Sequence, residues 1–162
     1  MTSPSQPRPS QLLQPQRTPV PARDASTLLL LRDCADGKGF EVLMTRRADQ
    51  GIFANAYVFP GGGQEDEDAA PASHALARLR PSMIAEAGDE RITQALAGIR
   101  ETFEELGILL AYDQAGQPVP PAQVQQLDRK ASLYEQCRAR GWTLAVDQLW
   151  YLANWTAPFD LP

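Results

Sequence analysis

One long amphipathic segment constrains this chain of 162 residues more than any other feature. Between Asp89 and Leu106 the apolar residues recur at alternating spacings of four and three, as on one face of an α-helix. They are Ile92, Leu96, Ile99, Phe103 and Leu106. We expect Asp89 to be the N-cap, and Gly107 stands where a left-handed glycine commonly follows a helix. The pattern therefore predicts a helix from Asp89 to Leu106 with one buried face.

Short strands and a second helix are predicted around this segment. Two β-type runs enclose the turn signal Asp36–Gly39, which favours a hairpin. The other predicted elements are a strand at 56–59 that stops at Pro60 before a glycine turn at 61–63, a short helix around 74–80, a strand at 108–112, an amphipathic helix at 122–140 and an apolar strand at 149–155. This mixture indicates a single domain of the α/β (α+β) class.

Two segments differ from the rest in composition. Residues 1–23 are polar and rich in proline, which favours a disordered tail, so we place the folded domain at 24–162. Residues 64–88 are acidic and rich in alanine, with breaks at Pro71 and Pro81. We expect this second segment to be a surface insertion outside the catalytic core, and its His74 to be a surface residue.

Charge and hydropathy exclude several classes of partner. A net charge of −5 provides no basic field for a nucleic-acid polymer, and the longest apolar run, Leu28–Leu31, is too short to cross a membrane. Cys34 and Cys137 lie far apart without a CxxC spacing, which suits a reducing compartment. We therefore expect a cytoplasmic protein whose partner is a small molecule.

Three glutamates on the long helix form the clearest candidate site. Glu101, Glu104 and Glu105 stand at i, i+3 and i+4, so one helical face presents three carboxylates that repel each other. A divalent cation with hard oxygen ligands, Mg²⁺ or Mn²⁺, would relieve that repulsion. Arg100 can pair with Glu104 one turn later and fix its rotamer. The alternative is an ordinary solvated acidic face without a metal. The sequence around the glutamates decides between these two interpretations.

That pattern resembles the signature of the Nudix hydrolases. The segment 100–108, RETFEELGI, is similar to its second half, R-E-U-x-E-E-x-G-U, in which U is a bulky apolar residue and Thr102 departs from it. The segment 59–62, FPGG, resembles the strand-to-loop region that precedes the helix in this family. The glutamate expected six residues after Gly62 is Asp68, and 31 residues separate it from Arg100 where the signature has seven. Such a split signature is similar to that of the coenzyme A diphosphatase subgroup, over roughly 27–158, where the segment 155–158, WTAP, is similar to the subgroup's W-x-T-P.

The resemblance implies a fold, an activity and a set of site residues. The fold is an α/β/α sandwich with a mixed sheet, and the activity is metal-dependent hydrolysis of a diphosphate linkage in coenzyme A, acyl-CoA or another nucleoside diphosphate derivative. An ADP-ribose or dinucleotide diphosphatase is the alternative substrate class, and a non-catalytic nucleotide-binding module the alternative function. The implied metal ligands are Glu101, Glu104, Glu105 and the Gly61 carbonyl; the implied catalytic residues are Arg100, Glu101 and Glu104.

Further residues are expected to surround that site. Glu65 and Asp68 could supply outer contacts to the metal ligands. Arg46, Arg47 and Gly62 are candidates for substrate binding, although two arginines that follow a strand are as readily explained as a solvated strand end. Trp142, Trp150, Trp155 and Tyr151 are expected to pack in the core rather than to stack on a base.

Members of that subgroup continue past the W-x-T-P segment into further strands and a closing helix. This chain stops at Pro162, so we expect a truncated chain with an unpaired edge beside residues 149–155. Exposed backbone and apolar surface of that kind favour association, and a homo-oligomer is therefore a further expectation.

Overall fold

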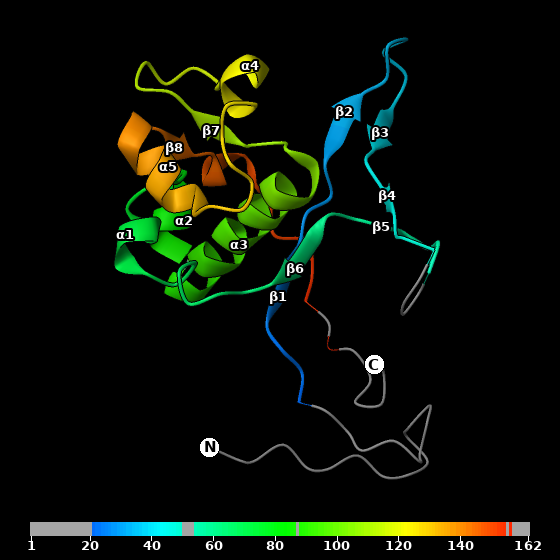
Figure 1. Cartoon of the computed structure of the whole chain (residues 1–162), viewed down its shortest axis with the longest axis horizontal. Helices are drawn as coiled ribbons and strands as arrows, with labels where there is room; N and C mark the ends of the chain where they lie inside the picture. The colour runs from blue at the N-terminus through cyan, green and yellow to red at the C-terminus, as the bar shows by residue number, and fades with distance from the viewer. Residues whose placement is uncertain (1–20, 50–53, 87, 155, 157–162) are drawn as a thin grey trace. The chain divides into compact units, whose positions relative to one another are not determined.

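The computed structural model describes residues 21–49, 54–86, 88–154 and 156 (Figure 1). Ala25–Trp150 form one compact unit, which holds every helix and strand described below. The other unit consists of Met1–Asp24 and Tyr151–Pro162, and its described residues form neither helix nor strand. Most of the predicted tail, 1–20, lies outside the described residues.

The long helix α3 spans Asp89–Leu106, as predicted. Gly107 follows it with a left-handed φ of 69°, and its N–H donates to the Phe103 carbonyl at 2.7 Å. The predicted N-cap is wrong by one residue, because Gly88 holds that position in an extended conformation and Asp89 starts the first turn. There its carboxylate, with that of Glu90, complements the positive end of the helix dipole.

The core lies against the buried face of α3. Leu96, Ile99 and Phe103 from that face are almost completely excluded from water. They belong to one apolar cluster with residues of α4 (Pro121–Val124), α5 (Leu133–Arg140), β7 (Ala111–Tyr112), β8 (Thr143–Leu144) and the 3-10 helix η2 (Val146–Gln148). Thr102 is also fully buried, and its hydroxyl satisfies itself by donating to the Gly98 carbonyl at 2.8 Å. The position therefore accepts a threonine without an unpaired polar atom.

The strands form four antiparallel pairs. They are β1 (Ala25–Thr27) with β6 (Gly61–Gly63), β2 (Leu31–Asp33) with β3 (Phe40–Val42), β4 (Thr45–Arg46) with β5 (Tyr57–Val58), and β7 with β8. The β2–β3 pair confirms the predicted hairpin around Asp36–Gly39, and its residues are all exposed. Parallel pairing is limited, among the described residues, to a single bridge between Ala77 and Leu144, so the expected mixed sheet is present only as small separate pairs.

The three glycines expected to form a turn are instead the strand β6. Gly61 pairs with Thr27 and Gly63 with Ala25, so β6 depends on a partner more than thirty residues earlier in the chain. Glycine is a poor strand former by itself, which is why the local sequence indicated a turn. The β1–β6 pair runs alongside α3 and brings backbone close to its glutamates (Figure 1).

Two predictions after α3 are wrong in their extent. The predicted helix over 122–140 is divided into α4 and α5, because Ser132 caps a new helix by accepting from the Glu135 N–H at 3.1 Å. Residues 149–154 are not a strand: an apolar run needs a pairing partner, and the described chain supplies none there. Trp150 and Tyr151 are exposed rather than buried in the core, while Trp142 is buried as expected. Trp155 lies outside the described residues.

The segment 64–88 has exposed residues, as expected of a surface insertion, but part of it also packs against the core. Its prolines start helices rather than break them, since α1 spans Pro71–His74 and α2 spans Pro81–Glu86. The backbone between these helices pairs with β8: Leu144 N–H donates to the Leu76 carbonyl at 2.8 Å, and Arg78 N–H donates to the Leu144 carbonyl at 2.9 Å. Within the described residues no helix is long and apolar enough to cross a membrane.

Candidate active site

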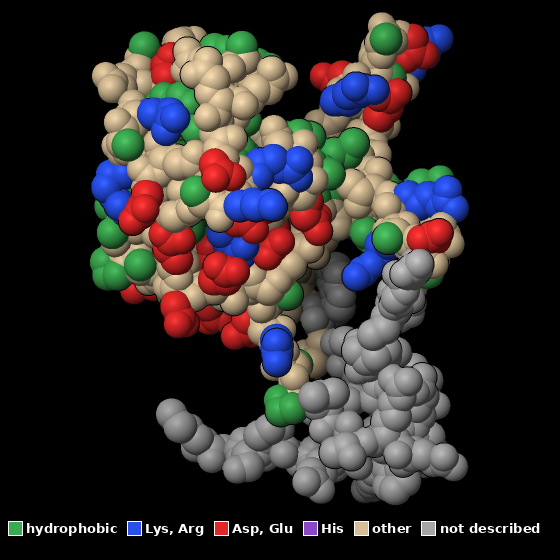
Figure 2. Space-filling view, in the orientation of Figure 1, with side chains coloured by type: hydrophobic (Ala, Val, Ile, Leu, Met, Phe, Trp, Pro, Cys, Tyr) green, Lys and Arg blue, Asp and Glu red, His purple; other side chains and the backbone are tan. Residues whose placement is uncertain are grey.

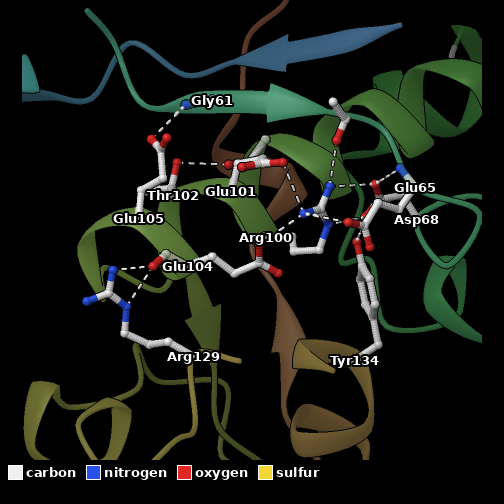
Figure 3. A network of polar contacts seen from close by, with 12 residues as sticks. Gly61, Glu65, Asp68, Arg100, Glu101, Thr102, Glu104, Glu105, Arg129 and Tyr134 are labelled. Atoms are coloured by element: carbon white, nitrogen blue, oxygen red, sulfur yellow. Dashed lines mark hydrogen bonds and ion pairs between the residues drawn. The ribbon is translucent and has the colours of Figure 1, made fainter. Parts of the chain in front are cut away.

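The candidate site lies where the glycine strand β6 faces α3 (Figure 3). The Gly61 N–H donates to a Glu105 carboxylate oxygen at 3.2 Å. Gly62 lies so close to Glu101 that a Cβ atom added to it would meet the Glu101 carboxylate at 2.5 Å. The absence of side chains on β6 therefore allows two of the predicted metal ligands to rest directly on backbone.

Arg100 joins the strand, the segment after it and the helix. Its Nε and Nη2 donate to the two oxygens of Asp68 at 2.9 and 3.1 Å, and Nη2 also donates to the Gly63 carbonyl at 2.7 Å. Its Nη1 donates to both Glu101 and Glu104 at 3.1 Å. The side chain is only 2% exposed, and these contacts give each of the five N–H groups of the guanidinium a protein partner. The predicted pairing with Glu104 is present, together with a pairing to Glu101.

The charge of Arg100 is strongly held. Burial opposes the charged form, but the hydrogen bond to Asp68 and the charges of Asp68, Glu104 and Glu101 outweigh it and raise the pKa of Arg100. A buried guanidinium is tolerated only when its charge is compensated in this way. Arg100 therefore acts as a fixed cation around which the carboxylates are arranged.

Glu104 is the carboxylate with a displaced titration. Burial raises its pKa, repulsion from Glu101 and Glu65 adds to that effect, and the charge of Arg100 opposes it. Its side chain remains 34% exposed. Arg129 donates from Nε to the Glu104 backbone carbonyl at 2.7 Å, which satisfies a carbonyl in the last turn of the helix. Glu104 thus combines access to solvent with a position fixed at both the backbone and the side chain.

Asp68 is a residue of this network whose position the sequence only partly indicated. It lies in the segment expected to be peripheral, yet it is fully buried. Besides Arg100 it accepts from the Tyr134 hydroxyl at 2.5 Å and from the Glu65 N–H at 2.8 Å. Its place six residues after Gly62 could identify it from sequence, whereas no local signal marked Tyr134.

The glutamates have the right chemistry for Mg²⁺ or Mn²⁺, since carboxylate oxygens are the hard ligands that such ions prefer. In this conformation, however, no three acidic, histidine or cysteine side chains of the described residues converge closely enough to hold an ion. Glu101 and Glu104 turn toward Arg100, and Glu105 accepts from the Gly61 N–H. The case for a metal therefore rests on the carboxylate oxygens of the three glutamates and on their position on one helix beside β6.

The remaining predicted site residues are not part of this network. Arg46 lies on β4, where it donates to Asn55 at 2.6 Å, and the Arg47 N–H donates to the Ala56 carbonyl. Neither makes a hydrogen bond or ion pair with the carboxylates of α3 within the described residues. His74 is half-buried and lies 2.9 Å from the Thr93 hydroxyl, so this contact is structural and the side chain is not simply a surface group.

Figure 2 shows acidic side chains gathered around α3 with basic ones among them.

Comparison with known proteins connects this fold to one class of enzyme. The chain is similar to the crystal structure of a NUDIX hydrolase from Alicyclobacillus acidocaldarius, with 30% sequence identity and a TM-score of 0.62. The match covers 78% of this chain and 58% of that protein, so the chain spans little more than half of its length. No family model matches the sequence, and no curated protein does.

The predicted fold class is confirmed by this likeness: a mixture of helices and small antiparallel sheets similar to a Nudix hydrolase fold. The likeness relates the fold of the chain to that of a Nudix hydrolase, and membership of that family belongs to the proposal below. The substrate, the metal and the role of each residue are proposals, which follow.

Proposed function

We propose that the chain is a Nudix hydrolase domain that uses Mg²⁺ or Mn²⁺ to cleave a diphosphate linkage in a nucleoside diphosphate derivative. The main support is that one guanidinium, Arg100, holds Glu101 and Glu104 on the helix face that adjoins the glycine strand. An ordinary solvated face would leave such side chains free to move. Here a buried arginine holds both carboxylates, and that of Glu101 lies against backbone that carries no side chain.

The residues then divide the work as follows. Glu101, Glu104 and Glu105 would hold the cation, with the Gly61 carbonyl as an additional ligand. The bound cation would neutralise diphosphate oxygens and lower the pKa of a water molecule. A carboxylate of the same face takes the proton of the attacking water, and Arg100 keeps Glu101 and Glu104 aligned. Gly62 leaves room for the Glu101 carboxylate and would contact the substrate through its backbone. Arg46 and Arg47 would contact the substrate phosphates.

For the substrate we propose coenzyme A or an acyl-CoA, on the basis of the split signature. The contact between Asp68 and Arg100 supports the interpretation that the two halves act as one motif. Although 31 residues separate them in sequence, two hydrogen bonds join them in the folded chain. The intervening residues would then border the substrate without interrupting the site.

A substrate panel tests both levels of the proposal. The purified protein is incubated with coenzyme A, an acyl-CoA, ADP-ribose and a dinucleotide diphosphate, each with Mg²⁺, with Mn²⁺ and with EDTA. Mass spectrometry of products formed in ¹⁸O-labelled water identifies the cleaved P–O bond. Preference for ADP-ribose or the dinucleotide would contradict the coenzyme A assignment alone. Nucleotide binding by calorimetry without hydrolysis of any substrate would indicate a non-catalytic module.

A further inference from the structure

Tyr134 places a polar group at the boundary between the hydrophobic core and the candidate site. It lies on α5, its side chain is completely buried, and it belongs to the same apolar cluster as Phe103. Its hydroxyl donates to Asp68 at 2.5 Å (Figure 3). Burial, reinforced by that hydrogen bond, raises the pKa of Tyr134, so the phenol keeps its proton and remains a donor.

The acceptor, Asp68, is held on both of its oxygens. Oδ1 accepts from Arg100 Nε and from Tyr134, and Oδ2 accepts from Arg100 Nη2 and from the Glu65 N–H. Tyr134 is the one of these donors whose side chain is packed in the core, whereas Glu65 lies in a turn and is largely exposed. The hydrogen bond from Tyr134 therefore fixes the orientation of the Asp68 carboxylate relative to the core.

The guanidinium of Arg100 transmits that orientation. Because it is planar, the edge that binds Asp68 determines where the opposite nitrogen, Nη1, points. Nη1 is the atom that donates to Glu101 and Glu104. A rotation of Asp68 would therefore displace Nη1 and change the separation of those two carboxylates.

We propose that Tyr134 is a positioning residue that acts through Asp68 and Arg100 to set the spacing of Glu101 and Glu104; its effect on cation binding rests on the proposed function. The same helix end makes a second contact, from the Ser132 hydroxyl to Glu67 at 2.5 Å. That contact holds the neighbouring turn but does not involve Asp68. The hydroxyl of Tyr134 is thus the link from α5 to the arginine.

The test compares two tyrosine hydroxyls in the full chain. Tyr134→Phe keeps the ring and removes the donor to Asp68, and Tyr112→Phe removes a matched hydroxyl bonded to Asp147 at 3.4 Å. We expect Tyr134→Phe to weaken Mn²⁺ binding, measured by electron paramagnetic resonance, about tenfold, as for other outer partners of metal ligands. Tyr112→Phe should leave Mn²⁺ affinity within twofold of wild type.

Thermal unfolding without cation separates this role from a purely structural one. A structural role would lower the Tm of Tyr134→Phe without changing Mn²⁺ affinity well below that temperature. An unchanged affinity overturns the inference while the proposed function stands. Failure of the wild-type protein to bind Mn²⁺ overturns both.

A second measurement keeps the inference testable if Tyr134→Phe does not fold. The chain has four tyrosines, so a protein labelled with 3-fluorotyrosine has few fluorine resonances to assign. Addition of Mg²⁺ should shift the Tyr134 resonance and leave that of Tyr112 in place. A Tyr134 resonance insensitive to saturating Mg²⁺ overturns the inference.

Discussion

Gly62 is a residue at which a single methyl group should affect catalysis. Its added Cβ would lie 2.5 Å from the Glu101 carboxylate, so that carboxylate must move. Since a displacement of about 1 Å in a catalytic group can cost about 100-fold in rate, we expect Gly62→Ala to lower kcat by at least about tenfold. The matched control is Gly63→Ala, where an added Cβ meets nothing within 4 Å. Steady-state kinetics that show equal losses in both variants would contradict the placement of Glu101.

Glu104 and Glu105 are expected to matter for chemistry more than for stability. Glu104→Gln or Glu105→Gln should lower kcat by roughly two orders of magnitude or more, because each removes a charged oxygen from the proposed metal site. The fold should survive, since partly exposed carboxylates contribute little to it. Glu90→Gln removes a carboxylate from the first turn of the same helix and should leave kcat unchanged. Retained activity in both variants, or full activity in EDTA, would refute the metal assignment.

Among single residues, the sequence predicted those site residues whose contacts lie within one turn of the same helix. Arg100, Glu101 and Glu104 could be predicted because their spacing fixes their contacts as soon as a helix forms. Tyr134 could not, because it stands 66 residues from Asp68 in a helix of otherwise ordinary composition. A buried hydroxyl is recognised only after the fold shows what lies opposite it.

The elements show the same division between local and distant causes. The helix α3 was predicted to its last residue, and its N-cap to within one residue, because its periodicity and the glycine after it act locally. The strand β6 was not, because three glycines extend only when β1 pairs with them. The proline breaks in 64–88 were interpreted as loop signals, whereas Pro71 and Pro81 begin short helices that pack on the core.

The end of α3 offers a stability prediction for an element. Gly107 has a φ of 69°, a conformation that costs an alanine about 1 kcal/mol. Gly107→Ala should therefore lower the free energy of unfolding by about that amount in urea titrations. Gly88, at the other end of the same helix, has a φ of −67° and free space around it, so Gly88→Ala should have a smaller effect. The reverse order of the two losses would show that the helix ends elsewhere.

For the whole molecule, Cys137 can report global unfolding. It is fully buried on α5, and burial raises the pKa of its thiol to about 12, with Arg140 opposing that shift. Because the thiolate is the nucleophile, about one molecule in 10⁴ is reactive at pH 8. We expect iodoacetamide to modify Cys34 in the native protein and Cys137 only in urea, as measured by peptide mass mapping.

The same pKa predicts a loss of stability in alkali. The folded state retains the thiol proton up to about pH 12, whereas the unfolded state loses it near pH 9. The unfolded state therefore binds fewer protons between these values, and the free energy of unfolding falls as pH rises, by at most about 1.4 kcal/mol per pH unit. Cys137→Ala should show a shallower decline over the same range, and an identical slope would contradict the burial of the thiol.

The fully hydrogen-bonded guanidinium of Arg100 also affects how a substrate and a cation would influence each other's binding. Its five N–H groups are all engaged, so it cannot bind a diphosphate without releasing a carboxylate or a carbonyl. Around it stand four carboxylates, those of Glu65, Asp68, Glu101 and Glu104, and the carboxylate of Glu105 lies against Gly61 of the adjoining strand. An anionic substrate would meet net repulsion there until a cation is present. Substrate and cation should consequently bind with positive cooperativity, each raising the affinity of the other by the same factor.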